Sequence, residues 1–153
     1  MKSKKKVLLV SSSGGHFEQL KCLKPLTSKY DCVVVTEKTD IGDKADYYVI
    51  QTGHKDKWVL PKMIWMAFQE LYIFIKERPD YIISTGTIVI LPFAYLAKFS
   101  KTKLIYIESF AKRTDPTKSG WFIYSRHLAD LFIIQWESLR EVYPDAVYGG
   151  GLY

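Results

Sequence analysis

Apolar residues in this chain come in short unbroken runs separated by longer segments with helical spacing. The unbroken runs are residues 7–10, 32–35, 47–50, 81–83, 104–107 and 131–134. Segments with helical spacing cover residues 15–29, 58–78, 87–99 and 119–127. Continuous apolar strands are typical of a parallel sheet that is covered on both faces. The alternation therefore predicts an α/β fold, a Rossmann-like doubly wound parallel sheet, formed by residues 1–153 as a single domain.

The segment 58–78 is apolar around more of its circumference than a surface helix requires. Its tryptophans and aliphatic residues are flanked by basic residues, namely Lys55, Lys57, Lys62, Lys76 and Arg78. One interpretation is a helix that touches a membrane surface, with tryptophans at headgroup depth and lysines facing anionic lipid. The other interpretation is a helix packed between the sheet and a neighbouring helix. The pattern leaves both open.

Composition narrows the class of protein. A chain of 153 residues with 48% hydrophobic and 25% charged residues is an ordinary globular domain. Its longest stretch without a charge, residues 81–97, is shorter than the about 20 residues of a membrane-spanning helix. Cys22 and Cys32 lack the spacing of a disulfide framework or a metal site, which indicates reduced cysteines in a cytoplasmic protein without a bound metal. The net charge of +6 favours an anionic ligand or surface.

The first candidate site is the loop that follows the first predicted strand. It contains Ser12, Ser13, Gly14, Gly15 and His16 and opens the first predicted helix. Adjacent glycines allow close backbone approach, and free amides at a helix start favour an anion such as phosphate. His16 lies in the first helical turn, where the helix dipole favours a neutral imidazole that can accept a proton. A structural tight turn and a histidine that caps its own helix are the alternatives.

Two further loops follow the fourth and fifth predicted strands. Ser84, Thr85 and Gly86 join a strand to a helix, and Glu108 and Ser109 end the next strand. Strands one and four flank the switch point of a doubly wound sheet, so the first two loops are expected to line one crevice. Glu108 could accept a hydrogen bond from a sugar hydroxyl or act as a base. The alternatives are a threonine helix cap and a solvated glutamate.

Taken in order, these loops resemble a known family. Ser-Ser-Gly-Gly-His at 12–16, Ser-Thr-Gly at 84–86, Glu-Ser-Phe-Ala at 108–111 and Gln-Trp-Glu at 135–137 are similar to segments of the bacterial PssD/CpsF polysaccharide-biosynthesis proteins. Those proteins are relatives of the eukaryotic asparagine-linked glycosylation 14 subunit. The chain also resembles, more distantly, the amino-terminal half of MurG, a GT-B glycosyltransferase.

The resemblance implies a GT-B amino-terminal, acceptor-binding domain whose donor-sugar domain is absent from this chain. A separate PssE/CpsG-like subunit is expected to bring the UDP-sugar, so this chain itself needs no cofactor. The implied acceptor is a saccharide on undecaprenyl diphosphate, in capsular or exopolysaccharide synthesis at the inner face of the cell membrane. The residues at 12–16, 84–86, 108 and 109 would bind the acceptor, with His16 or Glu108 as the base.

Two other function classes remain as alternatives. A self-sufficient, Rossmann-like nucleotide-binding enzyme would fit the fold, although the glycine loop matches neither GxGxxG nor GxxxxGK[ST]. A nucleic-acid module would fit the positive charge, but the aromatic residues lie in apolar runs and do not interleave with basic residues. We therefore expect no nucleic-acid partner.

Overall fold

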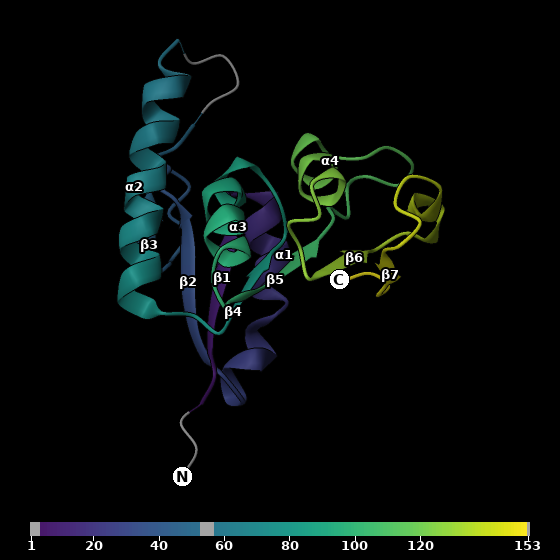
Figure 1. The fold of residues 1–153 in the computed structure, drawn as a ribbon, viewed down its shortest axis with the longest axis horizontal. Helices are drawn as coiled ribbons and strands as arrows, with labels where there is room; N and C mark the ends of the chain where they lie inside the picture. Colours follow the sequence, from purple (N-terminus) through teal and green to yellow (C-terminus); the bar gives the residue numbers. More distant parts are fainter. Residues whose placement is uncertain (1–3, 53–56, 153) are drawn as a thin grey trace.

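A seven-stranded, all-parallel sheet forms the centre of the molecule (Figure 1). The computed structural model describes residues 4–52 and 57–152. The strands are β1 (Lys6–Ser11), β2 (Asp31–Glu37), β3 (Tyr47–Val49), β4 (Tyr81–Ser84), β5 (Lys103–Ile107), β6 (Leu131–Ile134) and β7 (Val147–Tyr148). Their order is β3-β2-β1-β4-β5-β6-β7. The strands β2 and β3 are added on one side of β1, and β4 to β7 are added on its other side, so the switch point lies between β1 and β4.

This topology confirms the predicted fold class and all six predicted strands. The seventh strand, β7, was not predicted. It has only two residues, both exposed, and therefore lacks the buried apolar run that marked the other strands. Its pairing with β6 brings the following Gly149 close to the Ile133 side chain, and Gly151 lies close to the Phe110 ring. Tyr153 lies outside the described residues.

In the described part of the chain, four α-helices connect the strands. They are α1 (Gly15–Lys21), α2 (Val59–Glu77), α3 (Leu91–Lys98) and α4 (Lys118–Ser125), with 3₁₀ turns at Lys24–Ser28, Ile88–Ile90 and Glu137–Glu141. The prediction of one helix over 15–29 was wrong, because Pro25 cannot continue an α-helix and the chain changes to a 3₁₀ turn. Pro92 is tolerated in the first turn of α3, where its missing amide would be unpaired in any case.

Alternate residues of the strands build two separate hydrophobic clusters. Leu8 and Val10 of β1 face a large cluster that includes Met66 of α2, Phe93 of α3 and Ile123 of α4. Figure 1 shows these three helices together on one side of the sheet. On the other side, Val7 and Leu9 pack in a smaller cluster with α1, the 3₁₀ turn after it and Leu152. The sheet is therefore covered on both faces, as its unbroken apolar strands require.

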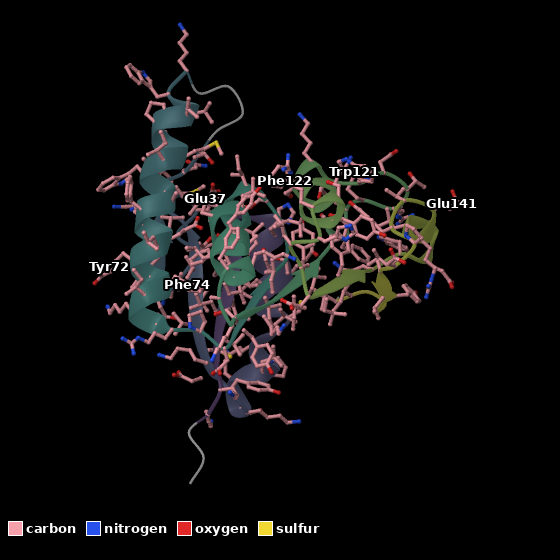
Figure 2. The ribbon with its side chains drawn as sticks, in the orientation of Figure 1. Glu37, Tyr72, Phe74, Trp121, Phe122 and Glu141 are labelled. Carbon is pink, nitrogen blue, oxygen red and sulfur yellow. The ribbon has the colours of Figure 1, made fainter. Side chains whose placement is uncertain are left out.

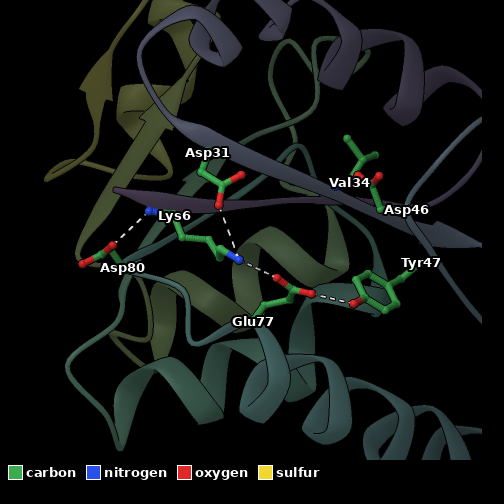
Figure 3. Close-up of polar contacts among 7 residues, drawn as sticks. All are labelled: Lys6, Asp31, Val34, Asp46, Tyr47, Glu77 and Asp80. Atoms are coloured by element: carbon green, nitrogen blue, oxygen red, sulfur yellow. Dashed lines mark hydrogen bonds and ion pairs between the residues drawn. The ribbon is translucent and has the colours of Figure 1, made fainter. Parts of the chain in front are cut away.

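Ion pairs gather at the amino ends of the strands. Lys6 Nζ lies 2.7 Å from Glu77 Oε2 and 3.4 Å from Asp31 Oδ2, and the Tyr47 hydroxyl donates to Glu77 Oε1 (Figure 3). The hydrogen bond from Lys6, reinforced by that from Tyr47, lowers the pKa of Glu77. Asp80 accepts from the Lys6 amide and pairs with Lys5. These contacts tie the end of α2 to the start of the sheet.

Helix α2 buries one face and exposes the other. Figure 2 shows Tyr72 pointing away from the sheet and Phe74 lying on its sheet-facing side. The exposed stripe consists of Leu60, Ile64, Trp65, Phe68, Leu71, Tyr72 and Ile75. As one of the two interpretations of 58–78 expected, α2 packs against the sheet and against α3, but these contacts leave the stripe uncovered among the described residues. Within residues 4–52 and 57–152, no helix combines the length and apolar character needed to cross a membrane.

Candidate functional site

A cavity of about 810 Å³ opens at the carboxyl ends of the strands, where doubly wound sheets bind ligands. Its polar wall includes Ser12, His16, Glu37, Thr52, Lys112 and Lys118. Its apolar wall includes Val59, Ile88, Leu91 and Phe122. Figure 2 shows Glu37 between α2 and α3, and Phe122 between α3 and α4. Leu91 and Phe122 also pack against the larger hydrophobic cluster, so the cavity borders that cluster and combines charged and apolar surface.

His16 links the first two predicted loops. Its Nδ1 lies 2.8 Å from the carbonyl oxygen of Thr85, and the Thr85 hydroxyl donates to the carbonyl oxygen of His16 at 2.8 Å. Because a carbonyl oxygen can only accept, Nδ1 carries the hydrogen and Nε2 of the neutral ring is the acceptor. The alternative of a histidine that caps its own helix is therefore wrong, since no side chain caps α1 and the His16 ring contacts Thr85 instead. The prediction that the loops after β1 and β4 line one crevice is confirmed.

The glycine loop before α1 already holds a carboxylate of the chain itself. Asp43 Oδ2 accepts from the Ser13 hydroxyl at 2.7 Å and from the Gly14 amide at 3.1 Å. Gly14 has a φ of 83°, a conformation that favours glycine. Ser12 and His16 line the cavity, whereas Gly14 and Gly15 do not. The binding of an acceptor phosphate by Gly14 and Gly15 stays a prediction, since it would require exchange with Asp43.

The loop after β4 is tightly fitted. Gly86 has a φ of 116°, and a Cβ added there would lie 3.2 Å from the His16 ring and 3.3 Å from the Tyr106 hydroxyl. Thr87, in the cavity wall, has a φ of 81°, which costs about 1–3 kcal/mol for a β-branched residue. Neither Thr85 nor Thr87 caps the following helix through its side chain, so that alternative is wrong. Ser84 is buried and accepts from the Gly86 amide.

Glu108 is completely buried and does not line the cavity. Its carboxylate accepts hydrogen bonds from the Tyr143 hydroxyl at 2.6 Å, the Thr117 hydroxyl at 2.8 Å, the Thr117 amide at 3.3 Å and the Ser109 amide at 2.8 Å. The alternative of a solvated glutamate is therefore wrong. Both of its oxygens are thus occupied by donors of the chain itself, away from the cavity wall. Ser109 is also buried and accepts from the Ala111 amide.

The Glu108 carboxylate instead positions the third loop. Thr117 caps α4 by accepting from the Gly120 amide, and its own amide and hydroxyl donate to Glu108. Lys112 and Lys118, on either side of this anchor, then face the cavity. Burial, followed by the charge of Glu108, raises the pKa of Tyr143, so its hydroxyl remains a donor. Arg113 lies outside the cavity and stacks on the Trp136 ring.

Glu37 and Thr52 are cavity residues that the sequence analysis did not include. Glu37 is 7% exposed, and burial raises the pKa of its carboxyl. Thr52 donates to it from its amide and its hydroxyl, both at 3.5 Å. The position of Glu37 could have identified it as a site residue. It is the last residue of β2, and ligands of doubly wound sheets bind at the carboxyl ends of the strands.

Among residues 4–52 and 57–152, no group of three or more histidine, cysteine, aspartate or glutamate side chains could hold a metal ion. The polar groups of the cavity are one imidazole, one carboxylate, two lysines and hydroxyls. Such a set can bind phosphate and hydroxyl groups and can accept a proton.

Solved structures with this fold include enzymes that act on nucleotide sugars. UDP-N-acetylglucosamine 2-epimerase from Rickettsia bellii superposes on 97% of this chain with a TM-score of 0.73 and 14% identity. MurG from Acinetobacter baumannii superposes on 88% with a TM-score of 0.66 and 13% identity. This chain spans 45% and 42% of those proteins, respectively. At such identities the likeness shows the fold alone, that of a GT-B amino-terminal domain.

Sequence comparisons identify the family. The human UDP-N-acetylglucosamine transferase subunit ALG14 is 26% identical over 94% of this chain and 81% of the human protein. The corresponding subunit of Debaryomyces hansenii is 30% identical over 92% of this chain and 62% of its own length. The profile of the family described as "Oligosaccharide biosynthesis protein Alg14 like" matches residues 58–152, more than half of the chain. The chain therefore belongs to the Alg14-like family of oligosaccharide biosynthesis proteins.

Proposed function

We propose that this chain is the acceptor-binding and membrane-recruiting subunit of a two-component glycosyltransferase. A second, PssE/CpsG-like subunit binds the UDP-sugar, and the two together transfer the sugar to a lipid-linked saccharide. The names of the relatives support this proposal, because they describe a subunit of a UDP-N-acetylglucosamine transferase. The observation that carries it is the cavity, which combines a proton acceptor, cationic groups and an apolar wall.

The acceptor in this proposal is a saccharide carried on undecaprenyl diphosphate. Lys112 and Lys118 lie in the cavity wall, and no ion pair to a described carboxylate occupies either of them. They hold the diphosphate, while Ile88, Leu91 and Phe122 contact the first isoprene units. The pathway is capsular or exopolysaccharide synthesis.

His16 is the proposed base. Its Nε2 can accept the proton of the attacking sugar hydroxyl, and the bond from Nδ1 to Thr85 fixes the ring. The Gly14–Gly15 turn starts the helix that carries His16. Glu108, which lies outside the cavity, acts as a positioning residue for Lys112 and Lys118.

The exposed stripe of α2 is the proposed membrane contact, at the cytoplasmic face of the cell membrane. Trp65, Phe68 and Tyr72 provide aromatic surface of the type that binds at headgroup depth. Lys76 and Arg78 follow at the end of the helix, and the net charge of +6 favours an anionic surface.

Reconstitution tests the assignment. Each subunit alone and both together are assayed with UDP-N-acetylglucosamine and with sugars on undecaprenyl diphosphate. We expect turnover with the pair and almost none with either chain. Full turnover by this chain alone, or tight binding of the UDP-sugar to it in calorimetry, would overturn the proposal in favour of a self-sufficient enzyme.

A further inference from the structure

Glu37 is the only carboxylate among the described residues that line the cavity, and it is incompletely hydrogen-bonded. Both of its bonds, from Thr52, end on Oε1 at 3.5 Å, near the upper limit for a hydrogen bond. Its Oε2 has no hydrogen-bond partner in the described part of the chain, and it is not among the oxygens sealed away from solvent. The residue is more than nine-tenths buried and belongs to the cavity wall, so the cavity is the space from which a ligand can reach this carboxylate.

Packing beneath the cavity makes this position costly for an unbound carboxylate. Burial raises the pKa of the Glu37 carboxyl, and burial reinforced by the charge of Glu37 raises the pKa of Glu70, which is fully buried in α2. No lysine or arginine among the described residues forms an ion pair with Glu37. A buried carboxylate needs hydrogen-bond donors, and a molecule bound in the cavity can supply donors that Thr52 does not.

The distribution of charge decides which kind of donor that molecule offers. Lys112 lies in the loop after β5 and Lys118 is the first residue of α4, whereas Glu37 ends β2, on the other side of β1 and β4 in the sheet. A phosphate is attracted by the lysines and repelled by Glu37. Neutral hydroxyl groups, by contrast, donate well to a carboxylate, and such charge-assisted bonds are stronger than those between neutral groups.

We infer that Glu37 binds hydroxyl groups of the saccharide carried by the acceptor and so orients that saccharide in the cavity. This inference rests on the proposed function and adds the group that recognises the sugar. The acceptor then lies with its diphosphate at Lys112 and Lys118 and its sugar at Glu37. Glu37 is a specificity-determining residue, because a ligand without these hydroxyls leaves the buried carboxylate unpaired.

Binding to the intact chain separates the sugar contact from the phosphate contact. The probes are farnesyl diphosphate and farnesyl diphosphates that carry glucose, galactose or N-acetylglucosamine. For the wild type we expect at least one sugar-bearing probe to bind about tenfold more tightly than farnesyl diphosphate. In Glu37→Gln this increment falls to within about twofold, while the affinity for farnesyl diphosphate is unchanged or higher.

Two further variants control for charge and for folding. Glu141→Gln removes a carboxylate from the exposed 3₁₀ turn far from the cavity (Figure 2) and should keep the full increment. Glu37→Asp keeps the charge but withdraws it by one methylene, and we expect it to lose most of the increment. Circular dichroism and thermal unfolding establish that each variant is folded.

The outcomes are distinguishable. A full increment in a folded Glu37→Gln, or no increment in the wild type that binds farnesyl diphosphate, overturns the role of Glu37 and leaves the lipid-diphosphate proposal standing. A wild type that binds none of the four probes overturns both proposals.

Discussion

His16, at the start of α1, and Thr85, which follows β4, form a reciprocal pair of hydrogen bonds. The imidazole Nδ1 donates to the Thr85 carbonyl, and the Thr85 hydroxyl donates back to the His16 carbonyl, both at 2.8 Å. Gly86 lies so close to the imidazole that a Cβ there would be 3.2 Å from the ring. The ring is therefore held by two loops that are 69 residues apart in the sequence.

Replacing His16 by Ala should lower kcat of the reconstituted pair by about 100-fold, because a general base contributes that much or more. The KM for the UDP-sugar should not change, since in the proposed complex the second subunit binds it. His127→Asn is the matched control. His127 also lies at a loop and has a φ of 49°, which asparagine tolerates, but it does not line the cavity. An unchanged kcat in His16→Ala would remove the base role and leave the subunit assignment intact.

Gly120→Ala should destabilise the protein by about 2 kcal/mol or more, although alanine normally stabilises a helix relative to glycine. The added Cβ would lie 2.0 Å from Glu108 Oε2 and 2.7 Å from the Thr117 hydroxyl. Gly15→Ala is the control, because nothing lies within 4 Å of its added Cβ. Urea unfolding measures both. Equal free energies of unfolding for the two variants would contradict the prediction, because they would show that the Glu108 and Thr117 side chains move aside at little cost.

Glu70→Gln should make stability less dependent on pH. Burial, reinforced by the charge of Glu37, raises the pKa of Glu70 well above its usual value, although the Phe93 amide donates to Oε2. The contribution of a carboxyl with a raised folded-state pKa is complete at low pH and is lost as the pH rises through that pKa. The wild type should therefore lose stability above about pH 5, by at most about 1.4 kcal/mol per pH unit for one proton.

Chemical unfolding at several pH values checks this prediction. As the pH rises, the free energy of unfolding of Glu70→Gln should increase relative to that of the wild type. Glu141→Gln, with an exposed carboxylate, should follow the wild type throughout. Parallel pH profiles for Glu70→Gln and the wild type would contradict the prediction.

Trp65→Gln combined with Phe68→Gln should abolish binding to anionic phospholipid vesicles without unfolding the protein. Both side chains are more than half exposed on α2, so the folded state loses little buried surface. Phe99→Gln removes an exposed aromatic residue outside α2 and should leave vesicle binding unchanged. Co-sedimentation measures binding. If the double variant keeps vesicle binding but no longer co-purifies with the second subunit, the stripe is a protein interface instead.

The sheet was predictable because buried parallel strands need unbroken apolar runs, and six such runs became β1 to β6. Where this signal was absent, prediction failed. β7 has no buried residue, and the split of the first helix depends on a single proline.

The candidate site was predictable at the level of loops, since topology alone brings the ends of β1, β4 and β5 together. The roles of single side chains were not. The burial of Glu108 depends on Tyr143, which is 35 residues away. Asp43, which occupies the glycine loop, comes from the connection between β2 and β3. No local pattern announces such contacts.

The amino ends and the carboxyl ends of the strands have different roles. Lys5, Lys6 and Lys103 pair with carboxylates where the strands begin, whereas the cavity lies where they end. Substitutions at the amino ends of the strands can therefore change thermal stability and its dependence on salt without altering the cavity at the carboxyl ends. Substitutions that stabilise this protein can therefore be placed where the strands begin, away from the residues that line the cavity.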